Sequence, residues 1–89
     1  MKAVVTVVGR DTVGILAKVS ASCAEHNANI IDVTQSVMQE LFTMVMLVDI
    51  TDIKGDFSDL QNTLYALGDS IGMKIHVMHE DIFNSMHNI

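Results

Sequence analysis

Apolar residues alternate or run together in four segments whose lengths suit β-strands. Residues 2–8 hold four valines and are closed by Gly9, and both faces of this segment are apolar, which is typical of a central strand. Apolar alternation recurs over residues 30–38, 41–51 and 73–79. Only Gln39 and Glu40 separate the second segment from the third, so we expect a tight antiparallel hairpin there.

Two longer segments show the spacing of amphipathic helices. The first helix is expected over about residues 12–26, with Asp11 or the residue after it as the N-cap. The second helix is expected to begin after Asp56, because apolar residues then follow at intervals of three and four. Gly72 is placed to end this helix in a left-handed cap. Gly68 lies inside it, where we expect a close packing contact to explain the glycine.

The resulting order of elements predicts an α+β, ferredoxin-like βαββαβ sandwich, in which two helices cover one face of a four-stranded antiparallel sheet. We expect residues 1–89 to form a single domain, since a chain of this length supports one core. The other sheet face is expected to remain uncovered. A short terminal helix is indicated by the helical spacing of Ile82, Phe83, Met86 and Ile89.

Composition narrows the possible partners. Five Lys and Arg residues stand against eleven Asp and Glu residues, which gives a net charge of −6. This charge repels nucleic acids and anionic membrane surfaces, so we expect neither as a partner. Hydrophobic residues make up 49% of the chain, more than so small a core can hide, so we expect a homo-oligomer. Cys23 is the only cysteine, which fits a reducing cytoplasm.

The chain offers little that suggests catalysis, and we expect it not to be an enzyme. Cys23 falls on the apolar side of the first helix and has no histidine at a spacing that would meet it, so we interpret it as a buried structural residue. His76 and His79 point to opposite faces of a strand and cannot share a metal ion. We therefore expect no catalytic residue, no metal site and no cofactor.

The loop that follows the first strand is the strongest candidate for a binding site. It joins a strand to the beginning of a helix, where backbone N–H groups lack helical partners and the helix dipole favours an anion. Asp11 adds a negative charge beside this anion site, so a ligand with both a carboxylate and an ammonium group would satisfy both features. The residues alone leave open the alternative that the loop contains only a turn and a helix cap.

The segments VVGRDTVGILAKVS and NANIIDVTQSV resemble the ACT domain, a small regulatory module that binds amino acids and other effectors. Its Gly-x-Asp-x-x-Gly-Ile/Leu loop is matched by Gly9, Asp11, Gly14 and Ile15, and its second-strand motif is matched by Asn29, Ile30, Asp32 and Gln35. The closing HEDIFNSMHNI resembles the tail of a freestanding, largely uncharacterised bacterial and archaeal subgroup. The resemblance covers nearly the whole chain.

The resemblance implies a dimer formed side by side or face to face, with the effector held between the first loop of one protomer and the second strand of another. One wall of the implied site comprises Arg10, Asp11, Thr12, Val13, Gly14 and Ile15. The other wall comprises Asn29, Ile30, Ile31 and Asp32. The expected function is that of an amino-acid sensor that regulates another, unknown protein.

Two alternatives come from other functional classes. One is an interaction module that oligomerises and binds no small molecule. The other is an acylphosphatase-type hydrolase, which shares the element order and a phosphate-binding loop, and to which Arg10 would contribute. Ile15, Leu16 and Ala17 stand where the helix of such an enzyme would begin with its catalytic arginine, so this alternative is disfavoured.

Overall fold

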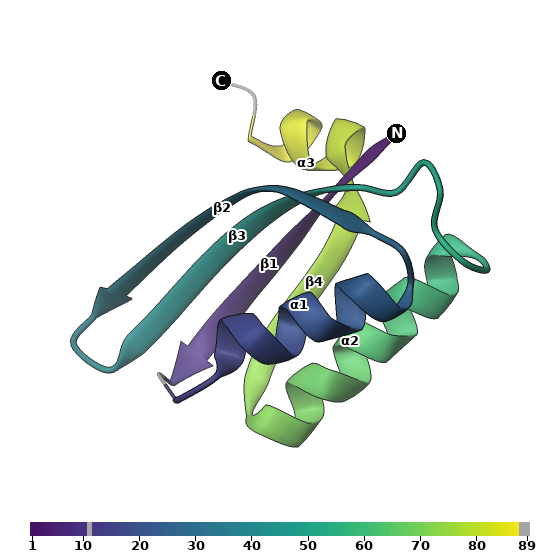
Figure 1. The fold of residues 1–89 in the computed structure, drawn as a ribbon. Helices are drawn as coiled ribbons and strands as arrows, with labels where there is room; N and C mark the ends of the chain where they lie inside the picture. The colour runs from purple at the N-terminus through teal and green to yellow at the C-terminus, as the bar shows by residue number, and fades with distance from the viewer. Residues whose placement is uncertain (11, 88–89) are drawn as a thin grey trace.

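The computed structural model describes residues 1–10 and 12–87. Four strands and three helices follow one another as β1 (Lys2–Arg10), α1 (Ile15–Glu25), β2 (Asn29–Met38), β3 (Leu41–Asp49), α2 (Phe57–Ile71), β4 (Met73–His79) and α3 (Glu80–Met86). The sheet is antiparallel with strand order β2-β3-β1-β4. Helices α1 and α2 lie side by side against the sheet, and the β2–β3 hairpin projects beyond them (Figure 1). The ferredoxin-like prediction is confirmed.

The position of β1 follows from its apolar faces. Ala3, Val5 and Val7 are fully buried under the helices, and Val4 on the opposite face is only 4% exposed. A strand with apolar side chains on both faces is typical of the interior of a sheet, where both edges are paired. β1 accordingly pairs with β3 along one edge and with β4 along the other.

The core lies between the sheet and the two long helices. Its fully buried side chains include Met44, Met46, Leu60 and Leu64, so two of the methionines fill space at the centre of the core. Cys23 is also fully buried there, as predicted. Burial raises the pKa of its thiol from 9.0 to about 11, because the thiolate loses its solvation in the apolar core.

The second helix matches its prediction at both ends. The Asp59 carboxylate accepts a hydrogen bond from the Asp56 N–H at 2.9 Å, one half of a capping box. Gly72 ends the helix with φ +72°, which is the left-handed conformation that favours glycine. Gly68 makes the expected close approach: a Cβ there would lie 2.7 Å from the Met73 carbonyl oxygen and 3.0 Å from Ile75 Cγ1.

The first helix begins later than predicted. It starts at Ile15 and has Gly14 at the N-cap position with φ +85°, so the prediction that Thr12 is the cap or the first helical residue is wrong. Asp11, the alternative cap, lies outside the described residues. The helical spacing of apolar residues extends from α1 toward the N-terminus into the loop. The left-handed backbone conformation of Gly14 nevertheless prevents the helix from including the residues before it, so Thr12 lies outside the helix.

The first strand is longer than predicted, because it continues past Val8 to Arg10. Gly9 therefore pairs within the sheet, opposite Phe42 and Met73. A Cβ on Gly9 would clash with Met73 Sδ. The glycine at this position leaves space for a core methionine and does not form the turn.

Helix α3 packs apart from the other two, near the end of the sheet where β4 finishes (Figure 1). It contacts β1 and β4. In the described part of the chain, no helix is both long and apolar enough to cross a lipid bilayer.

Substitution of Gly68 by alanine tests the contact between α2 and β4. Alanine favours a helix over glycine by up to about 1 kcal/mol, but the added Cβ must displace the β4 backbone, so we expect a net loss of about 1–3 kcal/mol in the free energy of unfolding. Urea unfolding measures this loss. The matched control is Asn62→Ala on the exposed side of α2, which should preserve or slightly raise stability; a stabilised Gly68→Ala variant would show that the contact does not constrain the helix.

Candidate functional site

The loop between β1 and α1 is exposed and has a specific backbone geometry. The Val13 side chain is 96% exposed. Gly14 lies in the left-handed region, and no heavy atom lies within 4 Å of the position where a Cβ would be. The glycine is therefore required by the backbone conformation, while the space beside it is open to solvent and to a ligand.

The beginning of α1 presents its backbone N–H groups next to this open space. Lys18 N donates to Gly14 O at 3.0 Å, which is the first hydrogen bond of the helix. The N–H groups of Ile15 and of the two residues after it therefore have no acceptor within the helix. Gly14 has no side chain with which to cap them. The positive end of the helix dipole lies at the same place. These features suit a carboxylate, as the sequence predicts.

The candidate site residues that the structure describes differ in how far their side chains are exposed to solvent. Ile15 is only 3% exposed and packs in the core, so it can offer a ligand only its backbone. The other described members of the two predicted walls are exposed: Arg10, Thr12, Val13, Gly14, Asn29, Ile30, Ile31 and Asp32. Asp11, which is predicted to contact the ammonium group of a ligand, lies outside the described residues.

Within one chain the two predicted walls lie at opposite ends of the sheet. Arg10 pairs with Leu41 of β3, whereas Asn29 pairs with Asp49 at the other end of the same strand. Leu41 and Asp49 are eight positions apart along β3, which corresponds to about 27 Å at about 3.4 Å per residue. A small ligand therefore cannot touch both walls of the same protomer, and the two walls could form one site only if they come from different copies of the chain.

The second wall contains a β-bulge. The register of β2 against β3 shifts between Ile30 and Asp32, so Ile31 has no partner residue on β3. The Asp32 carboxylate accepts a hydrogen bond from the Val33 N–H at 2.9 Å. Bulges twist a strand and redirect side chains, and they are frequent beside functional sites.

Sequence reasoning missed apolar residues beside the loop. Val37 pairs with buried Phe42, which also pairs with Gly9, so all three face the helix layer. Val37 is nevertheless 52% exposed, and Leu16 in the first turn of α1 is 39% exposed. The alternation along β2 already places Val37 on the core side of the sheet. Only the structure shows that the helices do not extend over it.

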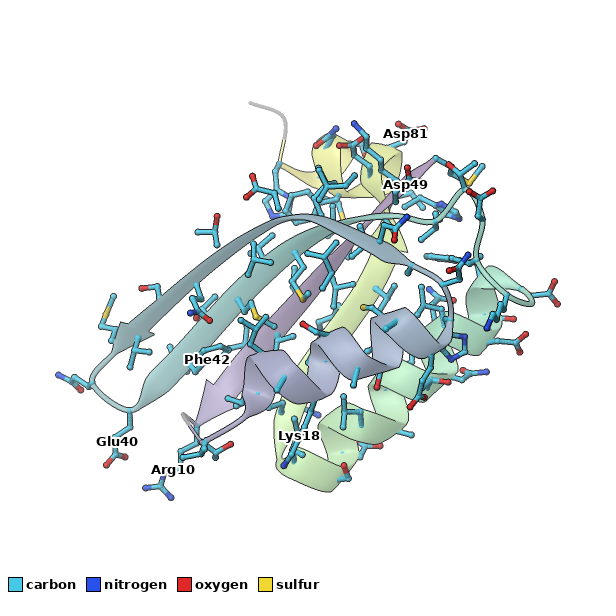
Figure 2. All side chains as sticks on the ribbon, viewed as in Figure 1. Arg10, Lys18, Glu40, Phe42, Asp49 and Asp81 are labelled. Atoms are coloured by element: carbon cyan, nitrogen blue, oxygen red, sulfur yellow. The ribbon has the colours of Figure 1, made fainter. Side chains whose placement is uncertain are left out.

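The charged groups at the two ends of the sheet differ (Figure 2). Arg10 and Glu40 form an exposed ion pair of 3.0 Å at the hairpin end. At the opposite end, hydrogen bonds from the Thr51 side chain and from its backbone N–H hold the pKa of Asp49 below its usual range. Among residues 1–10 and 12–87, no group of three or more His, Cys, Asp and Glu side chains is placed to hold a metal ion.

Two surface hollows lie away from the loop. A cleft of about 610 Å³ separates the beginning of β1 from α3 and is lined by Met1, Lys2, His79, Glu80, Asp81 and Ile82. A smaller hollow of about 270 Å³ lies between α2 and β4. The described residues of the Gly9–Gly14 loop line neither of them.

Comparison with known proteins identifies the family. The family model described as the ACT domain matches residues 2–78. The chain belongs to the ACT domain family. It is 54% identical over 86 residues to a UPF0237 protein of Methanococcus maripaludis, with 97% of this chain and 96% of the relative covered. It is 46% identical to a UPF0237 protein of Listeria innocua, with both chains covered completely.

A solved structure supports the same assignment. An ACT domain protein from Streptococcus pneumoniae superposes with a TM-score of 0.80 at 44% identity, and 93% of each chain is covered. The ACT fold of the chain is thus supported by sequence and by structure. ACT domains are in general regulatory modules that bind ligands, which agrees with the exposed loop at the beginning of α1.

A substitution at Gly14 tests the loop geometry. Because φ is +85° and the space beside the glycine is open, Gly14→Ala should cost only the backbone strain, about 1–2 kcal/mol in the free energy of unfolding. Gly14→Asn should cost less, since asparagine tolerates the left-handed region better. Chemical denaturation of both variants checks this order, and equal stabilities of wild type and Gly14→Ala would contradict the required left-handed conformation.

Proposed function

We propose that the chain is a regulatory module that senses an amino acid in the cytoplasm and does not itself catalyse a reaction. The effector binds at the Gly9–Gly14 loop, at an interface between two copies of the chain. Binding then changes how this assembly contacts a regulated protein. Membership of the ACT domain family and the exposed N-terminus of α1 beside an open left-handed glycine support this function.

The observation that carries the proposal is the placement of the two walls at opposite ends of one sheet. β2 is an edge strand, and its outer edge can pair with β2 of a second copy. Antiparallel pairing about a two-fold axis through the middle of β2 brings the partner's Asn29–Asp32 segment to the end of the sheet that holds the Gly9–Gly14 loop. One edge contact would then complete two identical sites.

The two edges of the sheet support pairing through β2. The side chains of α2 reach the other edge strand, β4, where Gln61 Nε2 donates to the Val77 carbonyl at 2.8 Å. The β2 strand instead leaves Ile31 48% exposed and Met38 72% exposed. An unprotected apolar edge strand readily pairs with another strand.

An amino acid fits the chemistry of the loop. Its carboxylate would accept hydrogen bonds from the N–H groups at the beginning of α1. Its ammonium group would contact Asp11 or the partner's Asp32. Its side chain would lie against Val13, Leu16 and Val37, the exposed apolar side chains of the loop and its surroundings.

A thermal-melting screen with the twenty amino acids tests ligand binding. A specific ligand at 100 times its Kd adds about 2.7 kcal/mol of stability, which raises the Tm of a domain this small by about 10–20 °C. Asp11→Asn and Gly14→Val should abolish the shift, whereas the control Asn62→Ala on α2 should retain it. If no amino acid shifts the Tm, the chain is not an amino-acid sensor, and the interaction module without a ligand takes its place.

The contribution of the β2 edge is tested separately by Ile31→Lys. A lysine at an exposed edge position opposes strand pairing, so we expect the mass of the assembly in solution to fall by half and any amino-acid response to disappear. Light scattering after size exclusion measures the mass. The matched control Asn62→Lys adds the same charge to α2 and should leave the mass unchanged; an unaltered mass in Ile31→Lys would refute pairing through β2.

A further inference from the structure

The β-bulge in β2 decides which face of the sheet Ile30 occupies. In an unbroken strand, side chains two positions apart share a face, so Ile30 would lie with Asp32 on the face opposite the helices. The extra residue Ile31 shifts the register, and Ile30 instead pairs with Val48, which is fully buried under the helices. Ile30 itself remains 38% exposed. The bulge therefore adds an accessible aliphatic side chain to the helix-covered face.

Val37 occupies the same face near the other end of β2. It pairs with Phe42 of β3, which is buried beneath the beginning of α1, while Val37 itself is about half exposed. The edge strand thus has an accessible aliphatic side chain near each of its ends, and both side chains point to the face that carries the helices.

Antiparallel pairing of two copies through β2 brings these two side chains together. Thr34 is the middle one of the residues that pair with β3, so a two-fold axis through Thr34 pairs the strands along their full length. With Ile31 unpaired on this edge as well, Val37 stands directly opposite the partner's Ile30. Such opposite side chains have Cβ atoms about 4.5–5.5 Å apart, so the two residues form one continuous aliphatic surface.

The loop that follows β1 extends this surface. Phe42 lies between Gly9 and Val37 in one row across the sheet, so the row spans two strand spacings, about 9–10 Å, from the end of β1 to Val37. Val13 and Leu16 are exposed beside it. The polar side chains Thr12 and Gln35 border the same region and are uncharged.

The charged side chains of the hairpin lie on the other face. Arg10 pairs with Leu41, whose row is opposite in direction to that of Val37. Arg10 and Glu40 also form an ion pair with each other, and Figure 2 shows both farther toward the hairpin end than Phe42. A charged effector side chain would lose hydration without an ionic partner among these residues, whereas burial of an aliphatic side chain is favourable.

We propose that the effector is an amino acid with a branched aliphatic side chain, as in valine, leucine or isoleucine. This inference rests on the proposed function, because it names the class of amino acid that the same site selects. The methyl groups of the effector pack against Leu16, Val37 and the partner's Ile30. An aromatic effector finds no ring to stack on in the described part of this surface, where Phe42 is buried.

The first test compares two amino acids of the same shape. Threonine has a hydroxyl where valine has a methyl group, and an apolar pocket discriminates such a pair by about 100-fold. Isothermal titration calorimetry of the wild-type chain should therefore give a Kd about 100-fold lower for L-valine than for L-threonine. Equal Kd values, or tightest binding by a charged, polar or aromatic amino acid, would overturn this inference and leave the sensor function standing. Absence of binding by all twenty amino acids would overturn both.

The second test locates the selectivity at Val37. Val37→Thr replaces one methyl group of the site by a hydroxyl and should lower the ratio of the L-threonine Kd to the L-valine Kd by about 10-fold. The matched control is Val8→Thr, which makes the same change at a partly exposed position on the opposite face of the sheet and should leave the ratio unchanged. A wild-type ratio in Val37→Thr would show that Val37 does not line the site.

The third test concerns the side chain from the second copy. Ile30→Ala should raise the Kd of L-valine at least about 10-fold, whereas Ile30→Val keeps a branched side chain and should retain most of the affinity. Light scattering verifies that both variants keep the wild-type mass. Within one chain Ile30 is at the far end of the sheet from the loop, so this loss at constant mass supports the contact across copies. An unchanged Kd in Ile30→Ala would overturn it.

Discussion

The pairing of β1 on both of its edges is the interaction on which the rest of the structure depends. β3 and β4 come from distant parts of the chain, and β1 lies between them in the sheet. Both long helices pack on one face of this sheet. Val5 and Val7 on the helix-covered face and Val4 on the other face are buried, whereas Val8 is 37% exposed; burial of this kind is typical of a strand in the interior of a sheet. The loop that leads to α1 begins where this strand ends at Arg10, so a strand paired on both edges positions the candidate site.

The consequence of this arrangement is an asymmetric sheet. α2 packs against β4 and supplies the hydrogen bond to the Val77 carbonyl, whereas β2 is held mainly by β3 and carries exposed apolar side chains along its length. The same chain thus has one protected edge and one that can pair. Function in the proposed sensor depends on this difference, because the two walls of the site belong to different ends of a sheet and come together only between copies.

Much of the fold could be predicted from the sequence. The three-four spacing after Asp56 located α2, and the Gln39–Glu40 pair located the hairpin, because these signals are local and involve few residues. The beginning of α1 could not be located in the same way, since Leu16 and Val19 have helical spacing but the backbone turn at Gly14 interrupts the helix before Thr12. The extension of β1 to Arg10 was also missed, because the reason for Gly9 is a contact with Met73, far away in the sequence.

The sequence by itself determined the order of the elements, the buried character of Cys23 and the glycine loop that the ACT family shares. These depend on periodicity and on residue types at short spacing. Only the tertiary structure decided that the two walls are separated along the sheet, that Val37 is left exposed on the core side, and that α3 and the hairpin occupy opposite ends of the sheet. These properties depend on strand register and on how far each helix extends over the sheet, which are set by contacts between residues distant in the chain.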